Sequence, residues 1–99
     1  MDAHSEIPSD RRKEYDALVG LLMEHASPCD ESARTVAEWM ARASLRPGHL
    51  WRAMELGDRA ELRALFVTHF PALAAGNTKD MRWKKYLYKK LCGWPGFQG

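Results

Sequence analysis

The 99-residue sequence predicts an all-α fold, a small single domain of four or five short helices. Apolar residues recur at spacings of three and four, as they do on one face of a helix. No useful length of the chain alternates polar and apolar residues in the way of a half-buried strand, and no internal repeat is present. A hydrophobic content of 45% with 28% charged residues indicates a packed core.

The first helix is expected to run from a cap at Ser9 to about His25, with an apolar face made by Tyr15, Leu18, Val19 and Leu22. A second helix is expected to follow Ser27 or Asp30 as its cap and to end before Pro47. Small side chains dominate its apolar face, which consists of Ala33, Val36, Ala37, Met40 and Ala41. These alanines would allow a neighbouring helix to pack closely.

A short helical segment is expected over residues 49–56, ended by Gly57 in the left-handed conformation. Asp58 and Glu61 then have the spacing of a capping box, so the clearest helix of the chain begins there. The cap stands ahead of Leu62, Leu65, Phe66, His69 and Phe70. Pro71 interrupts this helix because proline has no backbone N–H to donate.

The segment 77–92 holds most of the unusual chemistry of the chain. Six Lys or Arg side chains lie between positions 79 and 90, against the single acid Asp80. Asn77 or Thr78 is expected to cap a last helix that runs to about Leu91 and is anchored by Met81, Leu87, Tyr88 and Leu91. Residues 1–78 carry nine basic and twelve acidic side chains, so the positive charge of the chain is confined to this end.

This basic helix has three interpretations that periodicity alone does not separate. It is a solvated face without a partner, or a nucleic-acid element whose lysines neutralise phosphates while its aromatic rings stack on bases. In the third interpretation it docks on an acidic protein partner or holds an oxyanion. The residues expected to contact the partner or oxyanion are Arg82, Trp83, Lys84, Lys85, Lys89 and Lys90.

No pair of a nucleophile and a base can be assembled from the sequence, so we expect no enzyme. If the chain binds a metal, the expected ligands are Cys92 first and then His49 and His69. Their spacing, with Cys29 included, matches no zinc pattern, because such patterns contain close pairs of ligands. A histidine beside apolar residues, such as His69 beside Phe70, is more often a structural group.

We expect one helical domain over residues 9–92, preceded by a flexible N-terminal arm (residues 1–8) and followed by a C-terminal tail (residues 93–99). No apolar segment of a signal peptide is present, and no run approaches the ~18 apolar residues of a membrane span. These features predict a cytoplasmic protein that contacts no membrane. Cys29 and Cys92 are widely separated and are expected to be reduced thiols.

Several motifs in the second half of the chain together resemble the NifQ family of nitrogen-fixation proteins. They are His49-Leu50-Trp51, the run from Asp58 to Leu62, the run from His69 to Ala74, and Asn77-Thr78 followed by Asp80-Met81-x-Trp83-Lys84-Lys85-x-x-Tyr88-Lys89-x-Leu91-Cys92. A weaker match covers EYDALVGLLMEHA and the alanine-rich helix after it. The resemblance therefore covers most of the chain.

The resemblance implies an accessory protein that supplies molybdenum, as molybdate or with an iron-sulfur cluster, to the nitrogenase iron-molybdenum cofactor. Its implied partners are nitrogenase cofactor-assembly proteins. Family members continue beyond the position of Cys92 into a motif of the form C-x4-C-x2-C-x5-C, which this sequence lacks. The chain is thus either a truncated product or a short relative, and we expect no stoichiometric cluster in a single copy. The alternative is a small helical binding module that docks on an acidic protein or, less favoured, on nucleic acid, without metal.

Overall fold

Residues 7–94 are described in the computed structural model, and they form the all-helical domain that the sequence predicts. In chain order the elements are the 3-10 helix η2 (Ser9–Arg11) and the α-helices α1 (Arg12–Glu24), α2 (Ala33–Ser44), α3 (Leu50–Ala53), α4 (Arg59–His69), α5 (Pro71–Ala75) and α6 (Trp83–Cys92). No strand occurs within this range. Residues 1–6 of the expected arm and residues 95–99 of the expected tail lie outside it.

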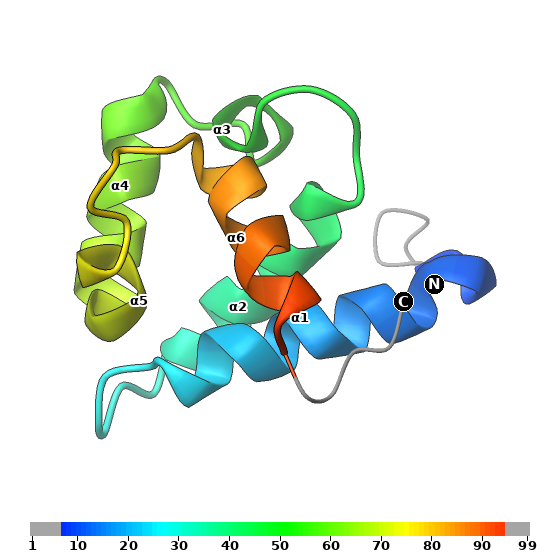
Figure 1. The fold of residues 1–99 in the computed structure, drawn as a ribbon, viewed down its shortest axis with the longest axis horizontal. Coiled ribbons are helices and arrows are strands. Elements are labelled where there is room, and N and C mark those ends of the chain that lie inside the picture. The colour runs from blue at the N-terminus through cyan, green and yellow to red at the C-terminus, as the bar shows by residue number, and fades with distance from the viewer. Residues whose placement is uncertain (1–6, 95–99) are drawn as a thin grey trace.

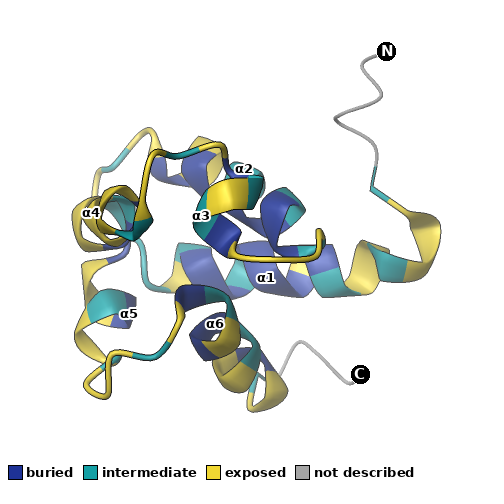
Figure 2. Cartoon of the chain, turned by 90° about the horizontal axis from the view of Figure 1, so that it is seen from above, coloured by how far each residue is buried: buried dark blue, intermediate teal, exposed yellow. Residues whose placement is uncertain are grey.

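The helices pack around one core. Helix α1 runs along one edge with α2 against it, α4 and α5 lie together on one side, and α6 crosses in front of α1 and α2 (Figure 1). Figure 2 shows that the buried positions of α1, α2 and α6 face the interior. Each α-helix contributes a side chain to this core, among them Leu18, Met40, Leu50, Phe66, Leu73 and Leu87. Because these helices are short, tertiary packing supplies most of their stability.

The predicted alanine face of α2 is buried, and α2 packs against α1. Ala33, Ala37 and Ala41 are fully buried in α2. Alanine carries no atoms beyond Cβ, so the two helix axes can approach closely, since axis separation depends on the side chains at the contact. The prediction of this face from the sequence is confirmed.

The cap of α4 also has the predicted geometry. The Asp58 carboxylate accepts a hydrogen bond from the backbone N–H of Glu61 at 3.0 Å. The Glu61 side chain reaches back to the backbone N–H of Gly57 at 2.8 Å, one residue before the position that a standard capping box uses. Pro71 is the first residue of α5, where its missing N–H costs nothing.

Three other predicted caps are wrong. Ser9 starts η2 and caps no helix with its side chain, because the chain makes a 3-10 turn before α1. No side chain caps α2 either: Asp30 instead accepts a hydrogen bond from the backbone N–H of Ser32, and Ser27 bonds to backbone atoms at the end of α4. Asn77 and Thr78 lie in the loop before α6, which begins later than predicted, at Trp83.

The left-handed residue after α3 is Glu55 and not Gly57. Glu55 has φ of 61°, and the backbone N–H groups of Glu55 and Leu56 donate to the carbonyls of Arg52 and Trp51. These two bonds form a Schellman motif, so the helix end is satisfied two residues earlier than the glycine suggests. The bond pattern decides the position of the turn more strongly than residue type.

Candidate functional site

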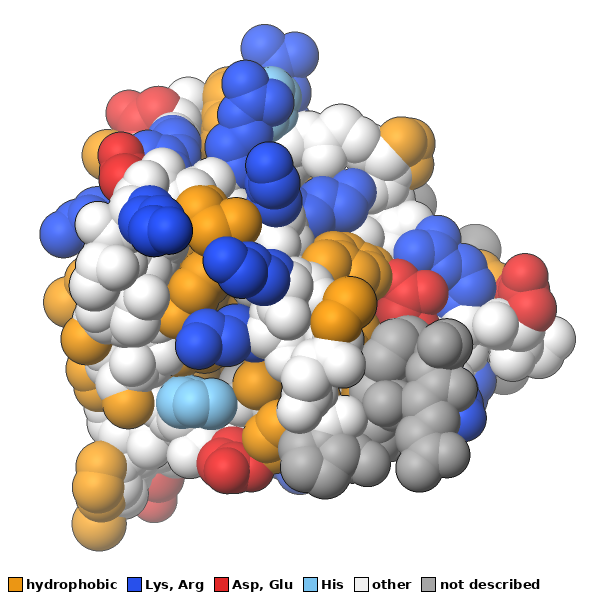
Figure 3. All heavy atoms as spheres, in the orientation of Figure 1, with side chains coloured by type: hydrophobic (Ala, Val, Ile, Leu, Met, Phe, Trp, Pro, Cys, Tyr) orange, Lys and Arg blue, Asp and Glu red, His pale blue; other side chains and the backbone are white. Residues whose placement is uncertain are grey.

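The basic residues of α6 divide between its two faces. Its inner face buries Trp83, Tyr86, Leu87 and Leu91, whereas Lys85, Lys89 and Lys90 are exposed. The helix contains no acidic residue. In Figure 3 the Lys and Arg side chains gather on the face that is turned to the viewer, over the region that α6 and the loop before it occupy in Figure 1. This surface is positive.

Trp83 belongs to the core and does not offer its ring to a partner as expected. The side chain is 3% exposed, and its ring stacks on Phe66 with centroids 4.2 Å apart and planes 16° apart. Tyr86 packs edge-on against it at 6.0 Å. The Trp83 indole N–H is buried and has no hydrogen-bond acceptor among residues 7–94. An unpaired buried donor is unusual, because most buried polar groups form a hydrogen bond.

Lys84 crosses from α6 to the loop between α2 and α3. Its ammonium group donates to the backbone carbonyl of Arg46 and, at 3.3 Å, to that of Gly48. Burial lowers the pKa of Lys84, and the nearby Arg11 guanidinium lowers it further. The Glu14 carboxylate acts in the opposite direction and raises this pKa. Lys84 therefore links α6 to the loop through two neutral carbonyls, and Glu14 is the acid whose charge acts on it.

An open groove of about 680 Å³ lies between this loop, the start of α4 and the start of α6. Its basic side chains are His49, Arg59, Arg82 and Lys84, and its single acid is Asp80. Arg59 pairs with the Asp80 carboxylate at 3.1 Å and donates to the Met81 carbonyl at 3.0 Å. Apolar surface comes from Leu50, Trp51, Leu62 and Trp83. The groove is thus lined by both apolar and basic side chains, and its net charge is positive.

The loop before α6 is fixed by its own side chains. The Asn77 carboxamide accepts a hydrogen bond from the Met81 N–H at 2.8 Å and donates to the Met81 carbonyl at 2.9 Å. Asp80 has φ of 50°, in the left-handed region that aspartate tolerates better than most residues. This turn directs the chain into α6 with Arg82 at the N-cap position, where no side chain caps the helix.

A second cavity, of about 440 Å³, opens on the other side of the same loop. Lys79, Lys89 and Lys90 line it, and no acidic residue does. The Lys90 ammonium lies 5.7 Å from the centroid of the Tyr86 ring. At Gly76 a Cβ atom would come within 2.5 Å of the Tyr86 hydroxyl, so the close approach at this wall requires glycine.

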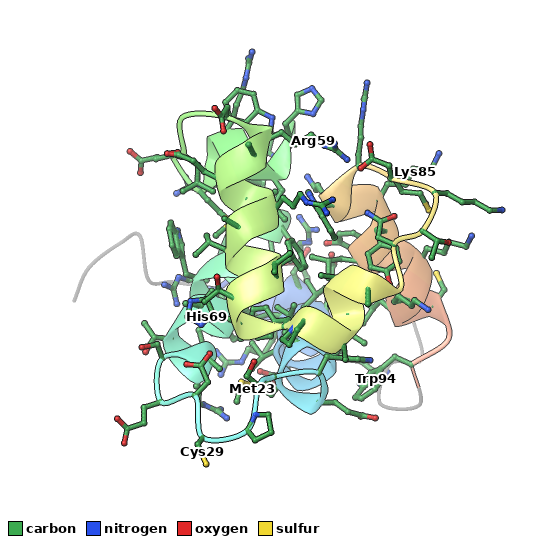
Figure 4. The ribbon with its side chains drawn as sticks, turned by 90° about the vertical axis from the view of Figure 1, so that its left-hand side faces the viewer. Met23, Cys29, Arg59, His69, Lys85 and Trp94 are labelled. Atoms are coloured by element: carbon green, nitrogen blue, oxygen red, sulfur yellow. The ribbon has the colours of Figure 1, made fainter. Side chains whose placement is uncertain are left out.

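The three expected metal ligands do not come together. His49 lies in the groove and is stacked on Trp51 with ring centroids 6.3 Å apart. His69 lies at the opposite end of α4 from Arg59, about 15 Å along the helix axis, as the labelled residues of Figure 4 also show. Cys92 is exposed in the last turn of α6. Within residues 7–94 no group of three His, Cys, Asp or Glu side chains is placed to hold a metal ion.

His69 has a structural partner. Its Nδ1 lies 2.7 Å from the Asp30 carboxylate, and hydrogen bonding to His69 is the main cause that lowers the pKa of Asp30. The His69 carbonyl also accepts from the Ser27 N–H at 3.0 Å. These contacts join the loop between α1 and α2 to the end of α4. Figure 4 shows Cys29 on this loop, away from the groove.

Sequence reasoning missed a polar cluster that joins α6 to α1. The Tyr88 hydroxyl donates to the Glu14 carboxylate, which also accepts from Arg11 at 2.8 Å. The Arg11 hydrogen bond is the main cause that lowers the pKa of Glu14, and burial is the main cause that raises the pKa of Tyr88. The sequence separation of 74 residues between Tyr88 and Glu14 leaves no local signal for this pair. Arg59 was likewise missed as a groove residue.

None of the helices within residues 7–94 has the length and apolar character needed to cross a membrane.

Comparison with known proteins identifies the family. The NifQ family model matches residues 1–98. A NifQ homolog from Sinorhizobium fredii is 52% identical over 80 residues, covering 81% of this chain and 35% of the relative. The NifQ protein of Azotobacter vinelandii is 43% identical (83% and 42% covered), and that of Klebsiella pneumoniae is 36% identical (89% and 51% covered). The chain thus spans about a third to a half of the length of these relatives, and no solved structure matches it. On the family match and these identities, the chain belongs to the NifQ family of nitrogen-fixation proteins.

Proposed function

We propose that the chain acts in the cytoplasm as a non-enzymatic accessory protein in the supply of molybdenum to the iron-molybdenum cofactor of nitrogenase. In this role the helical domain docks, through the exposed basic face of α6, on an acidic surface of a cofactor-assembly protein. The observation that carries the docking part is the arrangement of Lys85, Lys89 and Lys90, which are exposed on a helix without any acid. A surface of one sign steers a partner of the opposite sign.

The placement of the aromatic rings favours a protein partner over nucleic acid. Single strands are bound by exposed rings on which successive bases stack. Trp83 and Tyr86 are buried, and the Tyr88 hydroxyl is engaged with Glu14. The exposed face of α6 therefore offers charge without the stacking surface that the nucleic-acid interpretation requires.

The proposal assigns no iron-sulfur cluster to the helical domain. A cluster is usually held by about four thiolates, whereas this chain contains only Cys29 and Cys92. Molybdenum is cargo in the proposed role, so the domain's own contribution is recognition. Elemental analysis and visible absorption of the chain, purified without oxygen, are expected to show no stoichiometric iron; several irons per chain, lost in Cys92→Ser, would contradict this assignment.

A chimera tests the role in molybdenum supply. The 82 matched residues of this chain replace the corresponding segment of the Azotobacter vinelandii NifQ protein, in a strain that lacks its own copy. We expect nitrogenase activity to return at limiting molybdate, and the need for the chimera to vanish at high molybdate, because excess cargo makes a supplier unnecessary. An inactive chimera at limiting molybdate, present at normal abundance, would refute the role.

Charge reversal tests the docking face. We expect Lys85→Glu with Lys89→Glu to slow association with a purified cofactor-assembly protein by about tenfold or more at low salt, with a smaller difference at high salt. Both lysines are exposed, so helical content should not change. The matched control reverses Arg12 and Arg34, which line a separate surface of α1 and α2, and it changes the net charge equally. Equal slowing by both pairs would show that net charge, and not the face of α6, governs association.

A further inference from the structure

The groove brings basic side chains together from three separate parts of the chain. His49 comes from the loop before α3, Arg59 from the start of α4, and Arg82 and Lys84 from the start of α6. Asp80, the only acid in the lining, is already paired with Arg59. Within residues 7–94, Arg82 makes no ion pair, and Lys84 bonds only to neutral carbonyls. The Glu14 carboxylate, which lies outside the groove lining, partly offsets Lys84, so the positive charge at the α6 side of the groove rests mainly on Arg82.

The start of α6 adds backbone donors to the same side. The first N–H groups of an α-helix have no partner within the helix, and the helix dipole makes that end positive. No side chain caps α6, and its first backbone bond runs from the Tyr86 N–H to the Arg82 carbonyl at 2.8 Å. Helix starts of this kind are known to bind anions.

A third feature points to a missing acceptor. Trp83 lines the groove, and its buried indole N–H has no acceptor among residues 7–94. A phenylalanine at position 83 could also stack on Phe66. The stack alone therefore does not explain why this residue is a tryptophan with an N–H group. An anion with several oxygen acceptors, bound beside α6, would bring acceptors to the groove that Trp83 lines.

We propose that this groove binds a tetrahedral oxyanion of the molybdate and sulfate class, held by Arg82, Lys84 and the donors at the start of α6. The groove volume of about 680 Å³ exceeds that of one such ion, so water completes its shell, as is common in polar sites. Asp80 directs the anion away from Arg59 toward Arg82. That molybdate is the ion bound in the cell rests on the proposed function, whereas the site rests on the groove.

Calorimetric titration of the full chain with molybdate, repeated with sulfate, tests the site. We expect saturable binding that Arg82→Ala weakens by about tenfold or more, since the variant removes one charge-assisted hydrogen bond. Arg63→Ala is the matched control: it removes the same guanidinium charge from an exposed position of α4 outside the groove lining and should leave affinity within twofold. Competition between the two ions is expected because they share one geometry and charge.

The Trp83 indole gives a local readout. Its N–H signal in a ¹⁵N-correlated NMR spectrum is assigned by its loss in Trp83→Phe, and it should shift on addition of molybdate while the chain stays folded. The proposal is overturned if neither ion binds saturably, if Arg82→Ala and Arg63→Ala weaken binding equally, or if the indole signal stays fixed at saturation. The titration contains no partner protein, so a negative result would not contradict docking through α6. An inactive chimera, in turn, would not contradict anion binding in the groove.

Discussion

Replacing Phe66 by alanine should remove a large part of the stability of the domain. The side chain is completely buried, stacks on Trp83 at 4.2 Å and meets Phe70 edge-on at 6.4 Å. Loss of a buried phenylalanine costs about 3–5 kcal/mol through lost transfer energy and the cavity left behind. The stacked pair makes the upper part of that range the better expectation, because such pairs add about 0.5–1.5 kcal/mol. Domains of this size have about 5–15 kcal/mol in total.

The assay is urea unfolding followed by circular dichroism, with Val67→Ala as the control. Val67 is the next residue of α4 but is 48% exposed, so its truncation should change the free energy of unfolding by no more than about 0.5 kcal/mol. Both variants truncate one side chain to alanine on the same helix, but only Phe66 is buried in the core. A loss below about 1 kcal/mol for Phe66→Ala, or equal losses for the two variants, would refute the assignment of the core between α4 and α6.

Three further predictions concern a cap, a close contact and a charge. Asp58→Ala should cost about 0.5–2 kcal/mol in urea unfolding, because the N-terminus of α4 loses its acceptor; no loss would contradict the cap. Gly76→Ala should lower the free energy of unfolding by about 1–3 kcal/mol because the added Cβ crowds the Tyr86 hydroxyl, and the same substitution should cost less in a Tyr86→Phe background. Additive losses would exclude that contact as the cause. Since the pKa of Glu14 is held below its ordinary 4.5, chiefly by Arg11, its stabilisation is complete above pH 4.5 and is lost as pH falls through the lowered pKa; Glu14→Gln should flatten that decline, and an unchanged acid profile would disprove it.

The sequence predicted the existence of the helices better than their ends. The apolar faces of α1, α2 and α4 repeat at helical spacing, so periodicity located them. Of the caps, Asp58 could be found because both partners of the cap lie within four residues. Ser27 could not, since its partners are backbone atoms at the end of α4. A polar residue near a helix end has several possible partners, and only the packed fold selects one.

The charge of the candidate site was predictable, but its shape was not. The excess of lysine and arginine after position 78 is a property of composition, and it placed the positive surface on the last helix. The groove, in contrast, depends on Arg59 and Lys84 reaching segments 21 to 38 residues away. Trp83 could not be separated from the lysines beside it by sequence, because buried and charged residues are interleaved along α6.

Because α6 is the last of the described helices, part of the core stays uncovered while the chain is being synthesised. Trp83 and Leu87 cover core that α1 and α4 expose, yet they follow Phe66 by about twenty residues. At ~5–20 residues per second, translation from Phe66 to Cys92 takes roughly 1–5 s. During that interval the nascent chain presents an apolar surface that only α6 later covers. Ribosome-associated chaperones should therefore engage this chain until α6 has emerged, and polypeptides released before residue 83 should aggregate.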